Sequence, residues 1–411
     1  MQRRQFIGGA FAAAVLAARG AMGAEAAADA AKALVGGKLP KWEKGHFRIH
    51  AIYTGRSEAT LLVFPDSTSM LIDCGEFTCR ETPHLPEGGM SAGEAICRYI
   101  MLNNPNGRKV DYFALTHYHT DHTGERHLPK PRSANGKYSL SGMGRAIDML
   151  DFGMMIDRSW PDMNDPAPRK DGFDHGSVLN TREVFEEAVR RGIKVEKFRL
   201  EKGSDQIRLM HGGSDMFSFT PLCARGRILR RDGSILKLSD IPGNPPLEKT
   251  GENPLSVGMI FSHGPFRYFT AGDFEGKRNE TALAAECPRV EVVKANHHGH
   301  KTMCVALLDA LRPKVTLACC WHRQHMESQT MNNYAAAKHP GLVATGFFPP
   351  SRKKEKGAEK YLHLIAKESF SPSTAVIDVE PDGKHYTLMM TDARRLDGDI
   401  TGAYRFETSA D

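Results

Sequence analysis

Residues 116–124 read THYHTDHTG, a segment in which three histidines and one aspartate follow each other closely. Neutral imidazoles and carboxylates hold zinc, manganese or iron while leaving a coordination position open for water. Burying so many polar groups without partners would cost desolvation free energy. The segment therefore predicts a metal site in which His117 and His119 converge on one ion, while Asp121 and His122 face a second ion.

A binuclear site needs further ligands, and a carboxylate that bridges both ions is an economical one. Asp273, in TAGD, has that character, and NHHGH supplies imidazoles from His297 and His298. Taken singly, each of these residues could be a solvated turn aspartate or a hydrogen-bonded loop histidine. Together with the first segment, they favour a shared metal centre.

Regular elements must position these residues. Residues 46–53 and 59–75 predict strands joined by a Pro-Asp turn. Residues 91–104 carry apolar residues at helical spacing behind a serine that can cap the helix. Residues 109–116 predict a buried strand that ends at the first histidine. This order is typical of an α/β fold, in which ligands gather at strand ends.

The middle of the chain is harder to assign. Residues 131–192 are rich in Gly, Met, Asp and Pro, and only TREVFEEAVRRG predicts a helix, so we expect an irregular insertion that could wall a substrate cleft. Regular structure is expected to resume with KVEKFRL, DQIRLM and FSFTPL, followed by a polar stretch. Later strands are predicted at 255–273 and 373–390 as hairpins, and at 290–300 and 314–320 with histidines after them.

The segments SMLIDCG, THYHTDH, TAGD and NHHGH, in this order, resemble the motifs of metallo-β-lactamase-fold hydrolases. Over roughly residues 46–340, the chain is also similar to the β-lactamase-like domain of the ComEC/Rec2 DNA-uptake proteins, in GRSEATLLVFPDSTSMLIDCG, VDYFALTHYHTDHTG, ENPLSVGMI and NHHGHKT. The many membrane helices of a DNA channel are absent from the sequence. The resemblance implies an α/β fold, a four-layer αββα sandwich over 46–400 with the insertion at about 131–192, between a linker at 31–45 and a tail at 401–411.

The resemblance also implies two divalent metal ions, with zinc expected and manganese or iron as alternatives. His117 and His119 would bind one ion and Asp121 and His122 the other, with Asp273 as the bridge. His298 would complete the second site, with His297 behind it or contacting substrate. Asp73 would hydrogen-bond a ligand and fix its tautomer.

The sequence departs from the family at the third motif, where a histidine is common and this chain has Asn253 in ENPLS. An amide is a poor zinc ligand. The first site could be weak, could use water, or could borrow His175 or His211, although His211 is more typical of an ordinary turn residue.

Such a centre predicts hydrolysis, because two cations lower the pKa of a shared water and yield a metal-bridged hydroxide. Asp121 could accept a hydrogen bond from this nucleophile. His297, His322 or His325 could protonate the leaving group. His322 and His325, in CWHRQH, could equally belong to a packed strand end.

Several basic residues favour a phosphodiester or another anionic ester as substrate. Lys294, Lys301 and Arg323 are expected near the metal edge, and SRKKEK forms a basic run at 351–356. Lactone, thioester and β-lactam hydrolases are the alternatives. A non-catalytic metal-binding protein is a further alternative, which Asn253 supports and the intact histidine segment opposes.

Residues 1–30 resemble a twin-arginine export signal, with Arg3 and Arg4 before a short apolar run and small residues near 24–27. An alanine-rich helix is the alternative. We expect a periplasmic or secreted protein, with the twin-arginine export machinery as a partner and no integral membrane domain after signal removal. The net charge of +6 supports an anionic substrate only weakly, and the eight cysteines lack a disulfide-framework spacing, so most should be buried.

Overall fold

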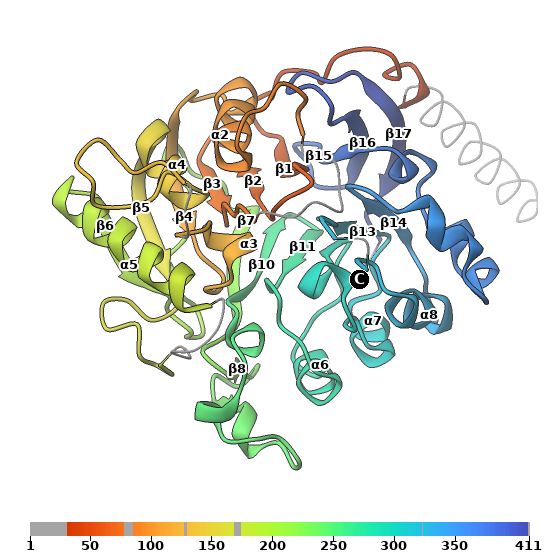
Figure 1. Ribbon diagram of the computed structural model, residues 1–411. Helices are drawn as coiled ribbons and strands as arrows, with labels where there is room; N and C mark the ends of the chain where they lie inside the picture. The colour runs from red at the N-terminus through yellow and green to blue at the C-terminus, as the bar shows by residue number, and fades with distance from the viewer. Residues whose placement is uncertain (1–30, 78–84, 127–129, 168–173, 323, 410–411) are drawn as a thin grey trace, which may run out of the picture.

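A computed structural model describes residues 31–409 apart from 78–84, 127–129, 168–173 and 323. Its strands form two sheets (Figure 1). The first sheet has the order β17-β16-β15-β1-β2-β3-β4-β5-β6. Its strands are β1 (Phe47–Ala51), β2 (Thr60–Val63), β3 (Ser69–Ile72), β4 (Lys109–Ala114), β5 (Asp151–Asp157), β6 (Lys194–Lys197), β15 (Ser373–Val379), β16 (His385–Asp392) and β17 (Ile400–Glu407).

The second sheet has the order β14-β13-β12-β11-β10-β7-β8-β9. Its strands are β7 (Phe217–Ala224), β8 (Arg227–Leu229), β9 (Ile235–Lys237), β10 (Gly258–His263), β11 (Phe266–Thr270), β12 (Val292–Lys294), β13 (Val315–Ala318) and β14 (Leu342–Thr345). The molecule therefore has a mixed α/β architecture with two large sheets.

The two sheets share one apolar core, which includes Phe47 of the first sheet and Phe261 of the second. Successive side chains of a strand point to opposite faces, so Leu62 of β2 joins this core while Leu61 and Val63 face away. Helices cover the other face of each sheet. The first sheet carries α2 (Ala92–Asn103), α4 (Met143–Met149) and α5 (Asp174–Arg190), and the second carries α6 (Lys277–Ala284), α7 (Val305–Leu311) and α8 (Ser328–Ala336).

Most predicted strands and the helix over 91–104 are present. The Ser91 hydroxyl caps α2 by accepting a hydrogen bond from the Glu94 amide at 3.2 Å. DQIRLM, however, forms no strand, because its backbone is held by side chains instead: the Met210 amide donates to Thr68 Oγ1 and the Tyr112 hydroxyl donates to the Arg208 carbonyl.

The segments expected to be an irregular insertion and a tail both contribute strands. Within 131–192, β5 lies between β4 and β6 in parallel pairing, and α4 and α5 pack over it, so this segment belongs to the sheet and its helical layer. At the end of the chain, β17 pairs antiparallel with β16, because its residues continue the hairpin that β15 and β16 begin.

No helix among the described residues has the length and apolarity needed to cross a membrane. The cysteines in the same part of the chain are free and buried, as the sequence predicts. Cys79, Arg323 and residues 1–30 lie outside the described part, and the same holds for the side chain of His175.

Candidate metal centre

Parallel strands bring the polar loops together at the sheet edges. β3 and β4 run parallel, so Asp73, which follows β3, meets the loop that follows β4. That loop carries His117 and His119 and leads into the short helix α3 (Thr120–Thr123). In the second sheet, β11 and β12 are parallel, so their carboxyl ends place Asp273 beside the turn η4 (Asn296–Gly299).

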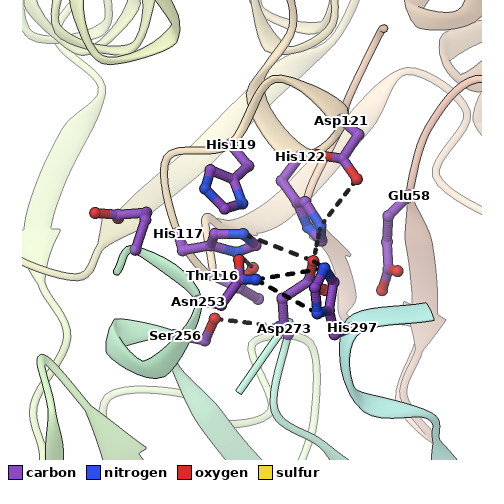
Figure 2. A network of polar contacts seen from close by, with 12 residues as sticks. Glu58, Thr116, His117, His119, Asp121, His122, Asn253, Ser256, Asp273 and His297 are labelled. Carbon is purple, nitrogen blue, oxygen red and sulfur yellow. Dashed lines mark hydrogen bonds and ion pairs between the residues drawn. The ribbon is translucent and has the colours of Figure 1, made fainter. Parts of the chain in front are cut away.

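One carboxylate oxygen, Asp273 Oδ2, lies among several imidazole nitrogens (Figure 2). Its distances to Nε2 atoms are 3.2 Å for His122, 3.4 Å for His298, 3.8 Å for His117 and 3.9 Å for His297. Most of these contacts are too long for good hydrogen bonds. Two ligands on one tetrahedral zinc ion, each bonded at about 2.0–2.2 Å, are about 3.3–3.5 Å apart. The spacing fits ligands arranged around metal ions.

The ligand atoms form two groups that share Asp273, and within each group all of them lie within 4.8 Å of one another. One group consists of His117, His119 and Asp273, and the other of Glu58, His122, Asp273 and His298. His117 Nε2, His122 Nε2 and Asp273 Oδ1 are buried without a hydrogen-bond partner. Buried polar atoms without partners are costly, so the donor set fits bound cations.

Asp121 borders the second group. Its Oδ2 atom lies 2.9 Å from His298 Nε2 and 3.6 Å from His122 Nε2. The same oxygen accepts a hydrogen bond from the indole Nε1 of Trp321 at 2.9 Å. Asp121 is therefore placed where a ligand of the second ion would lie, and its orientation depends on Trp321.

Two carboxylates lie behind the imidazoles of the second group. Asp73 Oδ2 is 2.7 Å from His122 Nδ1, and the Thr116 amide and hydroxyl donate to Asp73. Glu58 Oε2 is 3.0 Å from His298 Nδ1, but the hydrogen bond of this nitrogen is to the Cys319 carbonyl, also at 3.0 Å. A carboxylate or a backbone carbonyl in this position fixes the tautomer of a metal-binding histidine and turns its Nε2 toward the ion, so Asp73 does this for His122 and Cys319 for His298.

The charges of the centre compensate one another. Burial opposes a charged His122, but Asp273, Asp121 and Asp73 outweigh burial and raise its pKa well above the usual value. The pKa of His298 is raised in the same way, against its burial, chiefly by Asp273. For Asp273, the histidine rings and Lys294 overcome the effect of burial and hold the pKa well below its usual range. The centre is thus built to hold positive charge.

Lys294 differs from its expected role as a substrate-binding residue. Its side chain is 1% exposed, its Nζ lies 2.9 Å from Glu58 Oε1 and 3.5 Å from Asp273 Oδ1, and it donates to the Gly272 carbonyl. Its strand β12 runs beneath the centre, so the lysine pairs with buried carboxylates. Lys301 is exposed in the following loop.

His325 packs against His298, with ring centroids 4.7 Å apart and the rings nearly parallel at 16°. Its Nδ1 atom accepts hydrogen bonds from the backbone amides of Trp321 and His322. Burial also holds the pKa of His325 well below its usual value, which opposes the charged form that a proton donor needs. These contacts favour the packing alternative for His325, while His322 is partly exposed beside it.

The two residues considered for the first site lie in different places. Asn253 Nδ2 is 3.3 Å from His297 Nε2 and 3.4 Å from Nδ1, and Asn253 Oδ1 is buried without a hydrogen-bond partner. His211 Nε2 instead pairs with Asp111 Oδ1 at 2.9 Å and joins neither ligand group.

Sequence reasoning missed Glu58 and Trp321. Glu58 stands just before β2 in SEAT, a context that looks like an ordinary strand start. Trp321 stands in the CWHRQH segment, where the histidines drew attention first. A signal exists only for Glu58, which is a charged residue next to the apolar run TLLV and would be costly to bury unpaired.

Searches against protein families and against curated proteins find no match. Among solved structures, the chain is similar to a protein of Parabacteroides distasonis that is provisionally named a metal-dependent hydrolase. The two are 12% identical, the match covers 73% of this chain and 92% of that one, and the TM-score is 0.33. This similarity is too low to support an inference about function.

Proposed function

We propose that this protein is a metal-dependent hydrolase of the metallo-β-lactamase fold, in a branch similar to the ComEC/Rec2 domain. The observation that carries the proposal is the position of Asp273 Oδ2 among imidazole nitrogens from both sheets. Helices on the outer faces of two packed sheets are consistent with the four-layer sandwich of that fold.

The buried charges support two cations. Four carboxylates, from Glu58, Asp73, Asp121 and Asp273, and one ammonium, from Lys294, leave three negative charges in the centre. Two divalent cations would leave one positive charge, which a bound anion such as hydroxide would cancel. A single dication would leave a buried negative charge, which is unfavourable.

Bound divalent cations would supply Lewis acidity and would lower the pKa of a water molecule toward neutrality. The chain itself supplies the positioning. Asp73 orients the imidazole of His122, the Cys319 carbonyl orients that of His298, and the Trp321 indole fixes Asp121. Asp121 can accept a hydrogen bond from an attacking water, as a group that orients the nucleophile should.

For the substrate, we propose a phosphodiester or another anionic ester. Phe77 and Trp321 are partly exposed and lie with ring centroids 5.2 Å apart at the Asp121 side, which provides apolar surface for the rest of such a molecule. Lys301, which is exposed in the loop after His298, is the basic residue that we assign to the anionic group. In lactones, thioesters and β-lactams, the alternative substrates, the same water would attack a carbonyl carbon instead of a phosphorus atom.

The proposal includes export, with residues 1–30 as a twin-arginine signal and a periplasmic or secreted mature protein. It rests on Arg3 and Arg4 and the apolar run behind them. Replacing both arginines by lysine should retain the protein in the cytoplasm of a bacterium with that export system. Export unaffected by the replacement would contradict this part.

The activity is tested with purified protein supplied with zinc or manganese and assayed on a chromogenic phosphodiester, a lactone, a thioester and a β-lactam. Metal-dependent cleavage of the phosphodiester is the expected result, with chelator-stripped protein and His119→Ala as inactive controls. Cleavage of only a carbonyl substrate would correct the substrate class. Two bound metals with no turnover on any substrate would favour the non-catalytic binding protein.

A further inference from the structure

We infer that His297 is a ligand of the first metal ion and takes the place that Asn253 leaves open. The inference rests on the proposed binuclear centre and assigns the two adjacent histidines of NHHGH to different ions. His298 belongs to the second group. His297, which we expected to contact substrate or donate a proton, then has a binding role.

The His297 ring points toward the centre at a ligand-like distance. Its Nε2 atom is 3.9 Å from Asp273 Oδ2, close to the 3.8 Å of His117 Nε2 from the same oxygen. On the other side of the ring, Nδ1 lies 2.8 Å from Glu275 Oε2. This is the arrangement that Asp73 makes with His122, and it is typical of histidines that bind metal.

The backbone is bent to allow this arrangement. His297 has φ 46° and ψ 46°, and His298 has φ 51° and ψ 17°, so two successive non-glycine residues are left-handed. Such conformations cost free energy and persist where the surrounding structure needs them. In an extended chain the two side chains would point to opposite sides. Here both Nε2 atoms lie within 4 Å of Asp273 Oδ2.

The neighbourhood of His297 favours a ligand over a free side chain. The His297 amide donates to the Gly272 carbonyl at 3.2 Å, which ties the turn to the residue before Asp273. The Asn253 amide lies against the ring and does not join the ligand groups. His297 lies outside the compact set of His117, His119 and Asp273, and it is 20% exposed, so it approaches the centre from the solvent side.

Native mass spectrometry of the full chain, loaded with zinc and then exchanged into metal-free buffer, tests the inference. We expect two zinc ions in the unchanged protein and one in His297→Asn, as in His119→Ala. Asparagine tolerates the left-handed backbone, and His297→Gln serves as a second variant if the first folds poorly. The matched control is His300→Ala: this ring lies 5.0 Å from His297, but its Nε2 pairs with Glu327. The His300→Ala variant should retain two zinc ions.

Two zinc ions in a folded His297→Asn or His297→Gln variant would overturn the inference. If that variant also lost turnover, His297 would be the proton donor and the proposed hydrolase would stand. Fewer than two ions in the unchanged protein would overturn the inference together with the binuclear centre. Replacing zinc by cobalt gives a second readout, since loss of one site should remove part of the visible absorption before any substrate is added.

Discussion

Oδ2 of Asp73 lies 2.7 Å from Nδ1 of His122, and this contact joins the end of β3 to the helix that follows β4. Thr116 is the second residue after β4, and it donates hydrogen bonds from its amide and its hydroxyl to the same carboxylate. The orientation of a candidate ligand is thus set by the neighbouring strand. The histidine segment alone does not determine where its rings point.

Asp73→Asn should weaken zinc binding in the second group by about 10- to 100-fold, because the amide no longer fixes the His122 tautomer. Asp73 has φ 60°, which asparagine tolerates, so the fold should be retained. Competition with a coloured chelator measures the affinity. Asp378→Asn is the control, since Asp378 pairs with His46 at 3.2 Å far from the centre in the sequence and outside both ligand groups. Equal affinities in the two variants would contradict the role of Asp73.

Lys294→Met should destabilise the metal-free protein by about 3–5 kcal/mol, because Glu58 would lose its buried partner. Glu58→Gln should destabilise the protein less, because the Lys294 ammonium keeps Asp273 and the Gly272 carbonyl as partners. The double variant should be less destabilised than the sum of the two single variants. Urea unfolding of the four proteins gives these free energies. Additive effects would show that the 2.9 Å pair does not act as a unit.

Trp321→Phe keeps most of the ring and removes the indole N–H that binds Asp121. A hydrogen bond to a charged group contributes about 1.5–3 kcal/mol, so kcat/KM should fall about tenfold or more. Trp42→Phe is the control, because its indole donates to the His46 carbonyl instead. If both variants keep full activity, the orientation of Asp121 does not depend on Trp321.

His50 provides a pH-dependent test of stability away from the ligand groups. Burial lowers its pKa from 6.5 to about 3, and its Nδ1 lies 3.0 Å from the Tyr99 hydroxyl. Because the folded-state pKa is the lower one, the unfolded state binds the extra proton between these values, and stability is lost as the pH falls below about 6.5.

In His50→Phe, the free energy of unfolding should therefore fall less steeply with acid, by up to about 1.4 kcal/mol per pH unit. Urea unfolding between pH 7 and pH 4.5 measures the two slopes. The absolute stability of the variant is not the test, because the Tyr99 hydroxyl loses its partner. Parallel slopes for the two proteins would mean that His50 is protonated in the folded state.

Most of the strands along the chain and the first histidine segment could be recognised because their signals are local. THYHTDHTG follows an apolar strand directly, and TAGD and NHHGH follow others. The pairing of Glu58 with Lys294 has no local signal, since the two residues are far apart in the sequence and meet only when the sheets pack.

The strand β5 was missed because what stabilises it is its pairing with β4, which the local sequence does not show. Its sequence DFGMMID contains Gly153, which weakens a strand prediction, but a Cβ at this position would lie 2.8 Å from the Asp111 carbonyl of β4. The glycine permits the close pairing that makes β5 part of the sheet. Just beyond β5, Arg158 Nε donates a hydrogen bond to Glu252. Glu252 also accepts a hydrogen bond from the amide of Tyr118, which lies between His117 and His119. A segment expected to be an irregular insertion thus holds the candidate metal-binding loop in place.

β1 lies between β2 and β15, and Phe47 pairs with Val379. One edge of this early strand stays unpaired until nearly the whole chain has been synthesised, so a growing chain carries an open, apolar template for pairing with other chains. Contacts this distant in sequence also slow folding. Shortening the chain before β15 would remove the partner of β1 and favour aggregation, even though every candidate metal ligand would still be present.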